Sequence, residues 1–409
     1  TIMWLLVFLL LTGNADAGVK RIYGIGSDGY SLGLGAHNLY QGMTLTTTGL
    51  NNPTKIITTK SGFSSALNAD GSLYWWGVTT GFPTKIPGNF SDFKDIKFFP
   101  MYNSNLYFYG LKNDGTLWKW TVTLQGGSNA TYSTPEQVSG FSNVIDFAIG
   151  EDFVVAIKSD KTVWLSGTKR YNCISEQSNN FVPPIRYYRC DTLTAPTQIN
   201  ELGFAAKKVI AGAYFTMVLD ELGHVYMFGV PPTYDPDNPL QYNSVTLISG
   251  LSNIVDIDYI YDSHYYNFYA LKSDGTVWIW GPSFYKNGQQ YIISPPQPAQ
   301  QVPFVNNVVK MSAGPHGVLV KKSDGSYYRW NGRNYPINAS EITPVSFFNS
   351  INGGTDIVSG MYHMLLLADY PNIDSVTITG PDDIPAGQPA TYTVQAVVSP
   401  AGDMPVEYN

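Results

Sequence analysis

Apolar and polar residues alternate along most of the chain, a pattern that favours β-strands over helices. The clearest example is residues 270–281, where two alternating segments flank Asp274 and Gly275. Asp-Gly is the strongest short hairpin signal, since a type I′ turn needs positive φ angles that Gly adopts freely. Related segments recur around positions 28, 70, 114, 160, 222 and 324, roughly 42 to 62 residues apart, a spacing typical of β-propellers.

Each repeat has the same order of predicted strands. An apolar strand that often ends in Gly precedes the hairpin, and a short strand often opened by Pro follows it, which makes four strands per unit. Residues 355–360 and 364–369 repeat the apolar strand and the first hairpin strand, and then the pattern stops. The N-terminal hairpin lacks these two strands, so we expect strands from both termini to close the ring and remove exposed edges. Seven hairpins and seven apolar strands predict an all-β, seven-bladed propeller; another division of the hairpins would give six or eight.

The two ends of the chain differ from the repeats. Residues 2–11 are apolar and are followed by small residues up to Ala17, as in a secretory signal peptide without its charged front end; a retained membrane anchor is the alternative. From residue 372 two alternating segments across a turn look like the start of an immunoglobulin-like β-sandwich. We therefore expect a signal peptide over 1–17, a propeller over 18–371 and a truncated immunoglobulin-like module over 372–409.

The charge balance narrows the class of partner. The chain has 24 Lys and Arg against 31 Asp and Glu, a net charge of −7, and its basic residues stand singly or in short pairs. Nucleic acid binding and insertion of the mature propeller into a membrane are therefore not expected. Cys173 and Cys190 lie in an inserted segment, residues 171–194, and in a secreted protein they favour a local disulfide; two free thiols are the alternative.

The repeated unit Ala-Leu-Lys-x-Asp-Gly-x-Val-x-x-Trp-Gly, followed by Pro-x-x-Ile, resembles the regulator of chromosome condensation (RCC) repeat over residues 20–370. The resemblance implies a seven-bladed β-propeller closed by strands from the two termini. The name-giving members bind chromatin and promote nucleotide exchange on a small GTPase, which a signal peptide and an acidic balance argue against. The chain is more similar to secreted bacterial members, which are binding modules on surface proteins.

No residue pattern supports catalysis, a metal site or a cofactor. The repeated Asp residues are explained by the turns that they occupy. His264, His316 and His363 stand at similar places in three repeats and could converge on a metal, but packing at a repeated position explains them better. The Trp residues of the hairpins are expected in the core between blades, with some left outside that could stack on sugars.

Tyrosine is concentrated at a few places that suit recognition surfaces, because Tyr, Asn and Ser make adaptable contacts. The densest run is residues 259–269, and long insertions at 171–194 and 231–243 add further tyrosines. The candidate binding surface comprises Tyr187, Tyr188, Tyr234, Tyr259, Tyr261, His264, Tyr265 and Tyr266.

These features predict a secreted or cell-surface propeller that acts as a non-catalytic binding scaffold. The preferred ligand is an extracellular protein held by loops on one propeller face. A polysaccharide held by exposed Tyr and Trp is the alternative, and a polysaccharide-degrading glycosidase or lyase is a remote one that would need paired carboxylates in one cleft.

Overall fold

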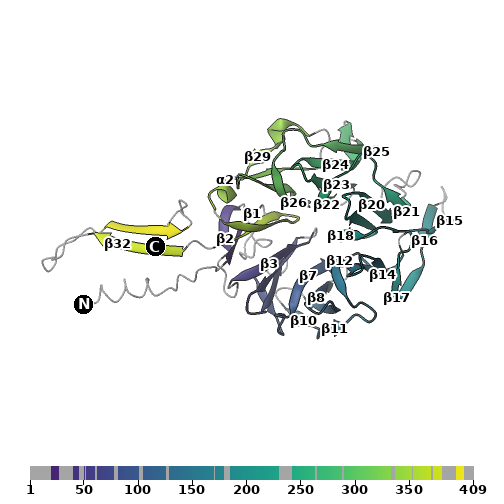
Figure 1. The fold of residues 1–409 in the computed structure, drawn as a ribbon, viewed down its shortest axis with the longest axis horizontal. Helices are drawn as coiled ribbons and strands as arrows, with labels where there is room; N and C mark the ends of the chain where they lie inside the picture. The colour runs from purple at the N-terminus through teal and green to yellow at the C-terminus, as the bar shows by residue number, and fades with distance from the viewer. Residues whose placement is uncertain are drawn as a thin grey trace.

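The computed structural model describes residues 20–26, 40–45, 50, 52–59, 62–77, 82–100, 105–125, 129–169, 171–178, 185–229, 242–262, 265–287, 290–332, 337–351, 353–369, 372–379 and 393–399. Most of these residues form seven small sheets around one axis, so the predicted all-β, seven-bladed propeller is confirmed (Figure 1). The helical segments in this part of the chain are two short ones, η1 (Ala339–Glu341) and α2 (Ser346–Asn349). Neither has the length or hydrophobicity that a membrane-crossing helix needs.

Each blade is an antiparallel sheet that begins with an inner strand beside the axis. Blade 1 contains β3 (Pro53–Thr58), β4 (Phe63–Asn68), β5 (Leu73–Gly77) and β6 (Thr84–Ile86). Blade 2 contains β7 (Phe93–Pro100), β8 (Asn105–Lys112), β9 (Leu117–Leu124), β10 (Ala130–Tyr132) and β11 (Glu136–Gln137). Blade 3 contains β12 (Val144–Ile149), β13 (Phe153–Lys158), β14 (Val163–Thr168) and β17 (Thr192–Gln198).

The remaining blades repeat this order. Blade 4 contains β18 (Ala206–Ala211), β19 (Phe215–Asp220), β20 (Val225–Gly229) and β21 (Tyr242–Leu247). Blade 5 contains β22 (Ile254–Asp262), β23 (Tyr265–Lys272), β24 (Val277–Asn287) and β25 (Gln290–Gln301). Blade 6 contains β26 (Val308–Gly314), β27 (Gly317–Lys322), β28 (Tyr327–Trp330) and β29 (Thr343–Pro344).

Blade 7 closes the ring with strands from both ends of the sequence. Its order is β30 (Gly354–Ser359), β31 (His363–Asp369), β1 (Lys20–Gly26) and β2 (Tyr40–Leu45). β1 pairs along its whole length with β31, and an ion pair of 3.1 Å joins Lys20 to Asp369 at one end of this pairing. The predicted closure by both termini is therefore confirmed, and it leaves no inner strand without neighbours around the axis.

The hairpin turns around positions 70, 114, 160, 222, 274 and 324 lie where the repeated unit predicts, but the predicted type I′ geometry is wrong. The pair Asp28 and Gly29 lies outside the described residues. The paired positions Leu67 and Leu73 leave residues 68–72 in the blade 1 loop, too many for a two-residue turn. The Gly71 amide donates to the Asn68 carbonyl at 3.0 Å, and Gly71 has a φ of 77° while Asp70 has no positive φ. This is a type I turn followed by a left-handed glycine, the commonest longer hairpin loop.

The turn aspartate has a separate role. One oxygen of Asp70 accepts hydrogen bonds from the amide of Ser72 at 2.8 Å and from its hydroxyl at 2.6 Å. These bonds hold the pKa of Asp70 below its ordinary value. The same arrangement joins Asp114 to Thr116, Asp160 to Thr162, Asp274 to Thr276 and Asp324 to Ser326.

In blade 3, Lys161 occupies the left-handed position with a φ of 69°. We expect Lys161→Gly to raise the free energy of unfolding by about 1 kcal/mol relative to Lys161→Ala, because a Cβ in this conformation is strained. Both variants lose the exposed Lys161–Glu221 ion pair, so their difference isolates the backbone effect. Urea unfolding measures it, and equal stability of the two variants would contradict it.

The hydrophobic core lies between neighbouring blades rather than in one central cluster. Phe215 and Met227 of blade 4, for example, pack with Ile257 and Phe268 of blade 5. The tryptophans of the third strands follow the predicted alternation except at Trp75 and Trp76, adjacent residues of β5 that are both buried, in two different core clusters. Trp76, Trp120, Trp280 and Trp330 are buried between blades, whereas Trp118, Trp164 and Trp278 are half-buried and their ring faces are covered by Lys112, Lys158 and Lys272.

The predicted disulfide joins Cys173 and Cys190, so this prediction is confirmed. It closes an insertion between β14 and β17 that contains a two-stranded sheet, β15 (Ile174–Ser178) and β16 (Ile185–Arg189). Buried Tyr171 at the base of the insertion packs edge-on against Phe228 of blade 4, with ring centroids 5.0 Å apart. The insertion is therefore anchored at its base to two blades.

After the propeller, β32 (Asn372–Thr379) and β33 (Thr393–Ser399) pair with each other as a separate two-stranded sheet. The two strands agree with the alternating segments seen in the sequence, and the immunoglobulin-like module remains a prediction. The proposed signal peptide, residues 1–17, lies outside the described residues. The division of the chain at residues 17 and 371 also remains a prediction.

Candidate functional site

The propeller has two faces that differ in what projects from them. One carries the turns between second and third strands, with Asp70, Asp114 and their equivalents; we call it the turn face. At the opposite end each inner strand ends and each third strand leads into its longer connection, and we call this end the loop face. Gly167, near the end of β14, pairs with Phe153 at the start of β13, which places the disulfide-closed insertion on the loop face. β20 ends and β21 begins at the same face, where Gly229 pairs with Tyr242.

The inner strands carry a repeated irregularity near their start. In all seven the register shifts by one residue at the same place, as at a β-bulge, and the residue after the shift is charged. We call these seven residues, together with Lys97, the ionic ring. Its members are Lys55, Asp95, Lys97, Asp146, Lys208, Asp256, Lys310 and Asp356.

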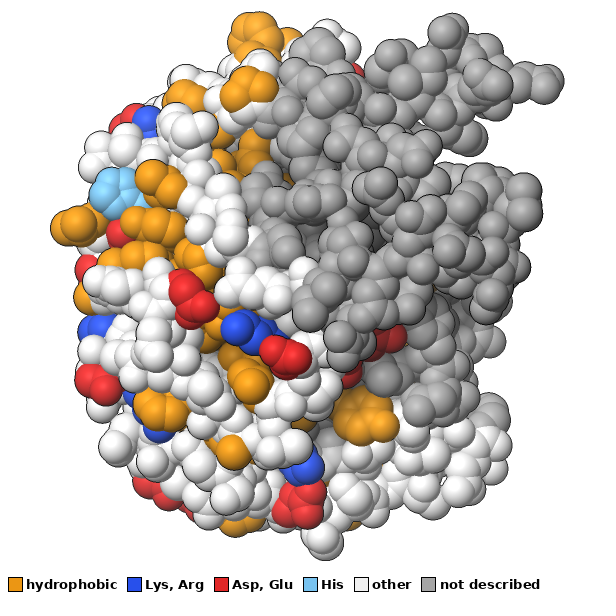
Figure 2. Space-filling view, turned by 90° about the vertical axis from the view of Figure 1, so that its right-hand side faces the viewer, with side chains coloured by type: hydrophobic (Ala, Val, Ile, Leu, Met, Phe, Trp, Pro, Cys, Tyr) orange, Lys and Arg blue, Asp and Glu red, His pale blue; other side chains and the backbone are white. Residues whose placement is uncertain are grey.

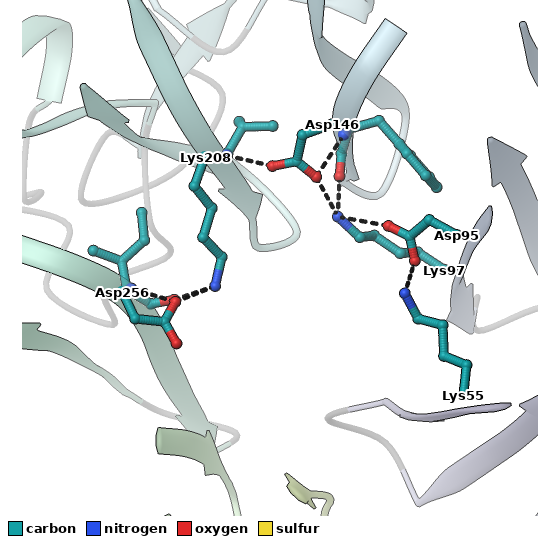
Figure 3. Close-up of polar contacts among 9 residues, drawn as sticks. Lys55, Asp95, Lys97, Asp146, Lys208 and Asp256 are labelled. Carbon is teal, nitrogen blue, oxygen red and sulfur yellow. Dashed lines mark hydrogen bonds and ion pairs between the residues drawn. The ribbon is translucent and has the colours of Figure 1, made fainter. Parts of the chain in front are cut away.

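Ion pairs connect the ring members across blade boundaries (Figure 3). Lys310 pairs with Asp356 at 2.6 Å, Lys208 with Asp256, and Lys55 with Asp95. Their side chains are 18–40 % exposed. Charges at one position of seven blades cannot alternate all the way round, because seven is an odd number. The two like charges that meet are Asp95 and Asp146.

Lys97 resolves this meeting of like charges. Lys97 stands two residues after Asp95 on β7. Its ammonium group lies 3.6 Å from the Asp95 carboxylate and 3.0 Å from the Asp146 carboxylate (Figure 3). Burial alone would raise the pKa of Asp146, but Lys97 and a 2.9 Å hydrogen bond from the Val209 amide hold it below its ordinary value. Burial lowers the pKa of Lys55 to about 8, and positive Lys97 acts in the same direction. The eight side chains have no net charge when all are ionised.

Beyond the ionic ring, toward the loop face, the axis opens into a cavity of about 410 Å³. Such a volume is in the range of ligand sites, roughly 300 to 1,000 Å³. Residues from the inner strands of blades 1 to 5 line it, and Lys97 and Asp258 lie where the ring and the cavity meet. Its walls are mostly apolar or aromatic, with Phe63, Phe98, Phe99, Ile149, Ile210, Ala211, Tyr214, Tyr259, Tyr261 and Tyr266 around Glu151, Thr58 and Thr59.

Three of the tyrosines in the predicted binding surface meet at this cavity. Tyr261 stacks on Tyr266 with ring centroids 4.8 Å apart, and Tyr266 packs edge-on against Phe215 of blade 4. Tyr259 donates its hydroxyl to the Ala211 carbonyl at 3.2 Å, and burial raises its pKa. Tyr259 and Tyr266 are buried at the cavity wall, while Tyr261 is half-buried.

The remaining residues of the predicted surface lie in the insertion, at the start of β23 or outside the described residues. Tyr187 and Tyr188 lie on β16 in the disulfide-closed insertion, opposite Glu176 and Ser175, and Tyr265 begins β23. Tyr234 and His264 lie outside the described residues. Ligand binding by any of the eight remains a prediction.

A serine–histidine contact elsewhere near the axis was not foreseen. Ser64 of blade 1 and His363 of blade 7 share a 2.7 Å hydrogen bond between Oγ and Nε2, and both side chains are fully buried. Burial, together with nearby His316, lowers the pKa of His363 to about 3. A neutral imidazole sealed from solvent joins the closing blade to blade 1 and is not accessible to a substrate. The described residues also contain no group of His, Cys, Asp or Glu arranged to hold a metal.

Sequence inspection missed Glu151, Tyr214 and the ionic ring. The ring had a visible signal, because a charged residue stands inside each apolar inner strand, as Asp146 does in residues 144–150. Glu151 and Tyr214 had no such signal in the sequence. Each lies in a connection that follows an inner strand, and the residues around that connection depend on the order of the blades around the axis.

Comparison with known proteins supports the fold. No family model matches the chain. Protein RCC2 homolog from Danio rerio is 24 % identical over 127 residues, which are 30 % of this chain and 24 % of that protein. The match thus spans less than a quarter of the relative's length.

Solved propellers align over a larger share of the chain. Prp20p from Saccharomyces cerevisiae aligns with a TM-score of 0.59 and 15 % identity over 86 % of this chain and 92 % of that one. A chain in the structure of Kap60 bound to yeast RCC1 (Prp20) aligns with a TM-score of 0.57 and 13 % identity over 87 % and 91 % of the two chains. The chain therefore has the fold of an RCC repeat β-propeller, as its repeated unit predicts.

Proposed function

We propose that this propeller is a secreted or cell-surface binding scaffold that recognises an extracellular protein at its loop face. The observation that carries the proposal is the axial cavity with aromatic walls, which opens on the face where the two long insertions emerge. Binding residues are disproportionately found on loops held by a rigid scaffold, and aromatic side chains dominate the centres of protein interfaces. The signal-peptide-like start and the disulfide agree with an extracellular location.

Propellers of similar fold bind proteins. The structure of Prp20p was described with its binding properties to Gsp1p and histones, and the related yeast structure is a complex with Kap60. We carry over only the use of a propeller as a protein-binding surface. On the described outer wall, Figure 2 shows acidic and basic side chains interspersed, with no large patch of basic ones, which suits a protein better than a nucleic acid.

A polysaccharide is the second candidate, because tyrosine rings line the cavity. It is less favoured since sugar stacking needs open ring faces. The faces of half-buried Trp118, Trp164 and Trp278 carry lysine ammonium groups 3.7–4.5 Å from the ring centroids.

Selection of ligands by class tests the proposal. The purified chain is panned against a phage-displayed random peptide library and, in parallel, incubated with a mixed glycan array. We expect peptides that bind saturably and no glycan that does. Saturable glycan binding that a Tyr261→Ala variant loses, with no selected peptide, would replace the protein partner by a sugar. If neither a peptide nor a glycan binds saturably, the proposal of a scaffold that binds proteins or sugars is refuted.

A further inference from the structure

The charged groups around the axial cavity differ in how far they are already satisfied. The Lys97 ammonium is fully committed, because it pairs with Asp95 and Asp146, donates to the Phe147 carbonyl and lies over the Phe147 ring. The Asp258 carboxylate accepts the Tyr259 amide at 2.8 Å and the Ala313 amide at 2.7 Å. Neither group needs a ligand to balance it.

Glu151 differs from these two groups. It lies just after β12, where its backbone amide donates to the Ala213 carbonyl at 3.1 Å and links blade 3 to blade 4. Its carboxylate forms no hydrogen bond or ion pair with any other residue in the described part of the chain, and its side chain is half-buried at the cavity wall. The ionic group that the cavity offers to a ligand is therefore negative.

The rest of the wall suits the remainder of a basic side chain. Ile149, Ile210 and Ala211 provide apolar surface along which a methylene stem packs. The rings of Tyr214 and Tyr261 also line the cavity, and aromatic rings attract cations. An anionic group would find no unpaired cationic side chain among the described lining residues, since Lys97 is already paired.

We propose that the axial cavity receives a Lys or Arg side chain of the protein partner, with its cationic end beside Glu151 and its stem against the apolar wall. The proposal rests on the proposed function and adds the chemistry of the partner to it. It makes a basic residue the anchor of the interface, the role that buried Arg and aromatic residues have in other interfaces.

A pair of small probes tests this directly. n-Butylguanidinium resembles the end of an Arg side chain, and n-butylurea has nearly the same shape without the charge. By saturation-transfer NMR and titration with the full chain, we expect n-butylguanidinium to bind about tenfold more tightly than n-butylurea, the effect of one charge-assisted hydrogen bond. Glu151→Gln is expected to abolish this preference, and Glu341→Gln, a half-buried position on η1 that does not line the cavity, is expected to keep it.

Two outcomes would overturn the inference: equal binding of the two probes by the wild type, or a preference that Glu151→Gln leaves intact. The peptide selection separates this from the wider proposal. Selected peptides that bind without any excess of Lys or Arg would refute the basic anchor and leave a protein-binding scaffold. If no peptide is selected, the protein-binding function fails whatever the probes show.

Discussion

Lowering the pH from 7 to 5 is expected to lower the free energy of unfolding of the wild-type propeller by about 2 kcal/mol. A His363→Gln variant is expected not to show this loss. His363 is fully buried, its Nδ1 has no hydrogen-bond partner in the described part of the chain, and burial with nearby His316 lowers its pKa to about 3. The unfolded chain regains the ordinary histidine pKa near 6.5. Between these two values the unfolded state binds a proton that the folded state does not. Stability therefore falls as the pH drops through about 6.5 and continues to fall toward about 3.

Guanidinium chloride unfolding at pH 7 and pH 5 measures this loss. Gln can keep a hydrogen bond to Ser64 and does not titrate, so the slope with pH can be compared even if the variant is less stable at pH 7. His224→Gln is the matched control, because the His224 side chain is 39 % exposed, and this variant is expected to show the wild-type loss. An equal loss in wild type and His363→Gln would refute the prediction, as would an NMR titration that protonates His363 near pH 6.

The second large effect concerns the ionic ring. Lys97→Met is expected to lower the free energy of unfolding by about 3 kcal/mol, because it leaves partly buried Asp146 facing Asp95 and takes away the cation that pairs with Asp146. Their side chains are only 18 % and 21 % exposed, so water screens them poorly. Adding Asp146→Asn to Lys97→Met removes the repulsion, and we expect the double variant to recover most of the loss.

Lys119→Met provides the comparison for a surface ion pair. Lys119 and Glu136 lie 3.1 Å apart with side chains 46 % and 69 % exposed, and the loss expected there is below about 1 kcal/mol. Urea unfolding of the three variants at constant ionic strength measures these differences. The role given to Lys97 fails if Lys97→Met costs no more than Lys119→Met, or if the double variant is no more stable than the single one.

The fold was predictable from sequence because each blade repeats its own local chemistry. Asp-Gly pairs place the hairpins, and the strands around Asp356 and Met364 reveal how blade 7 closes. The turn type was not predictable from the pair alone, because it depends on where pairing stops, here at Leu67 and Leu73. The hydroxyl residue two positions after each Asp was a usable signal for the side-chain bonds of the turn.

The candidate site was only partly predictable. The tyrosine-rich run contains Tyr259, Tyr261 and Tyr266, which line the cavity, but the burial of Tyr259 and Tyr266 depends on contacts with Phe215 of another blade. Charged residues in the inner strands were visible, yet their pairing depends on ring order. The role of Lys97 follows only from the fact that Asp95 and Asp146 become neighbours in an odd-numbered ring.

The measurement that tests the account most directly is where on the propeller a selected peptide binds. Ala213→Trp places a large ring at the cavity wall, and Leu222→Asp changes a 75 % exposed residue on the turn face. By fluorescence anisotropy, we expect Ala213→Trp to weaken binding of a labelled peptide by about tenfold or more, as loss of one interface anchor does, and Leu222→Asp to leave it unchanged. Binding that survives Ala213→Trp but is lost in Leu222→Asp would contradict recognition at the loop face.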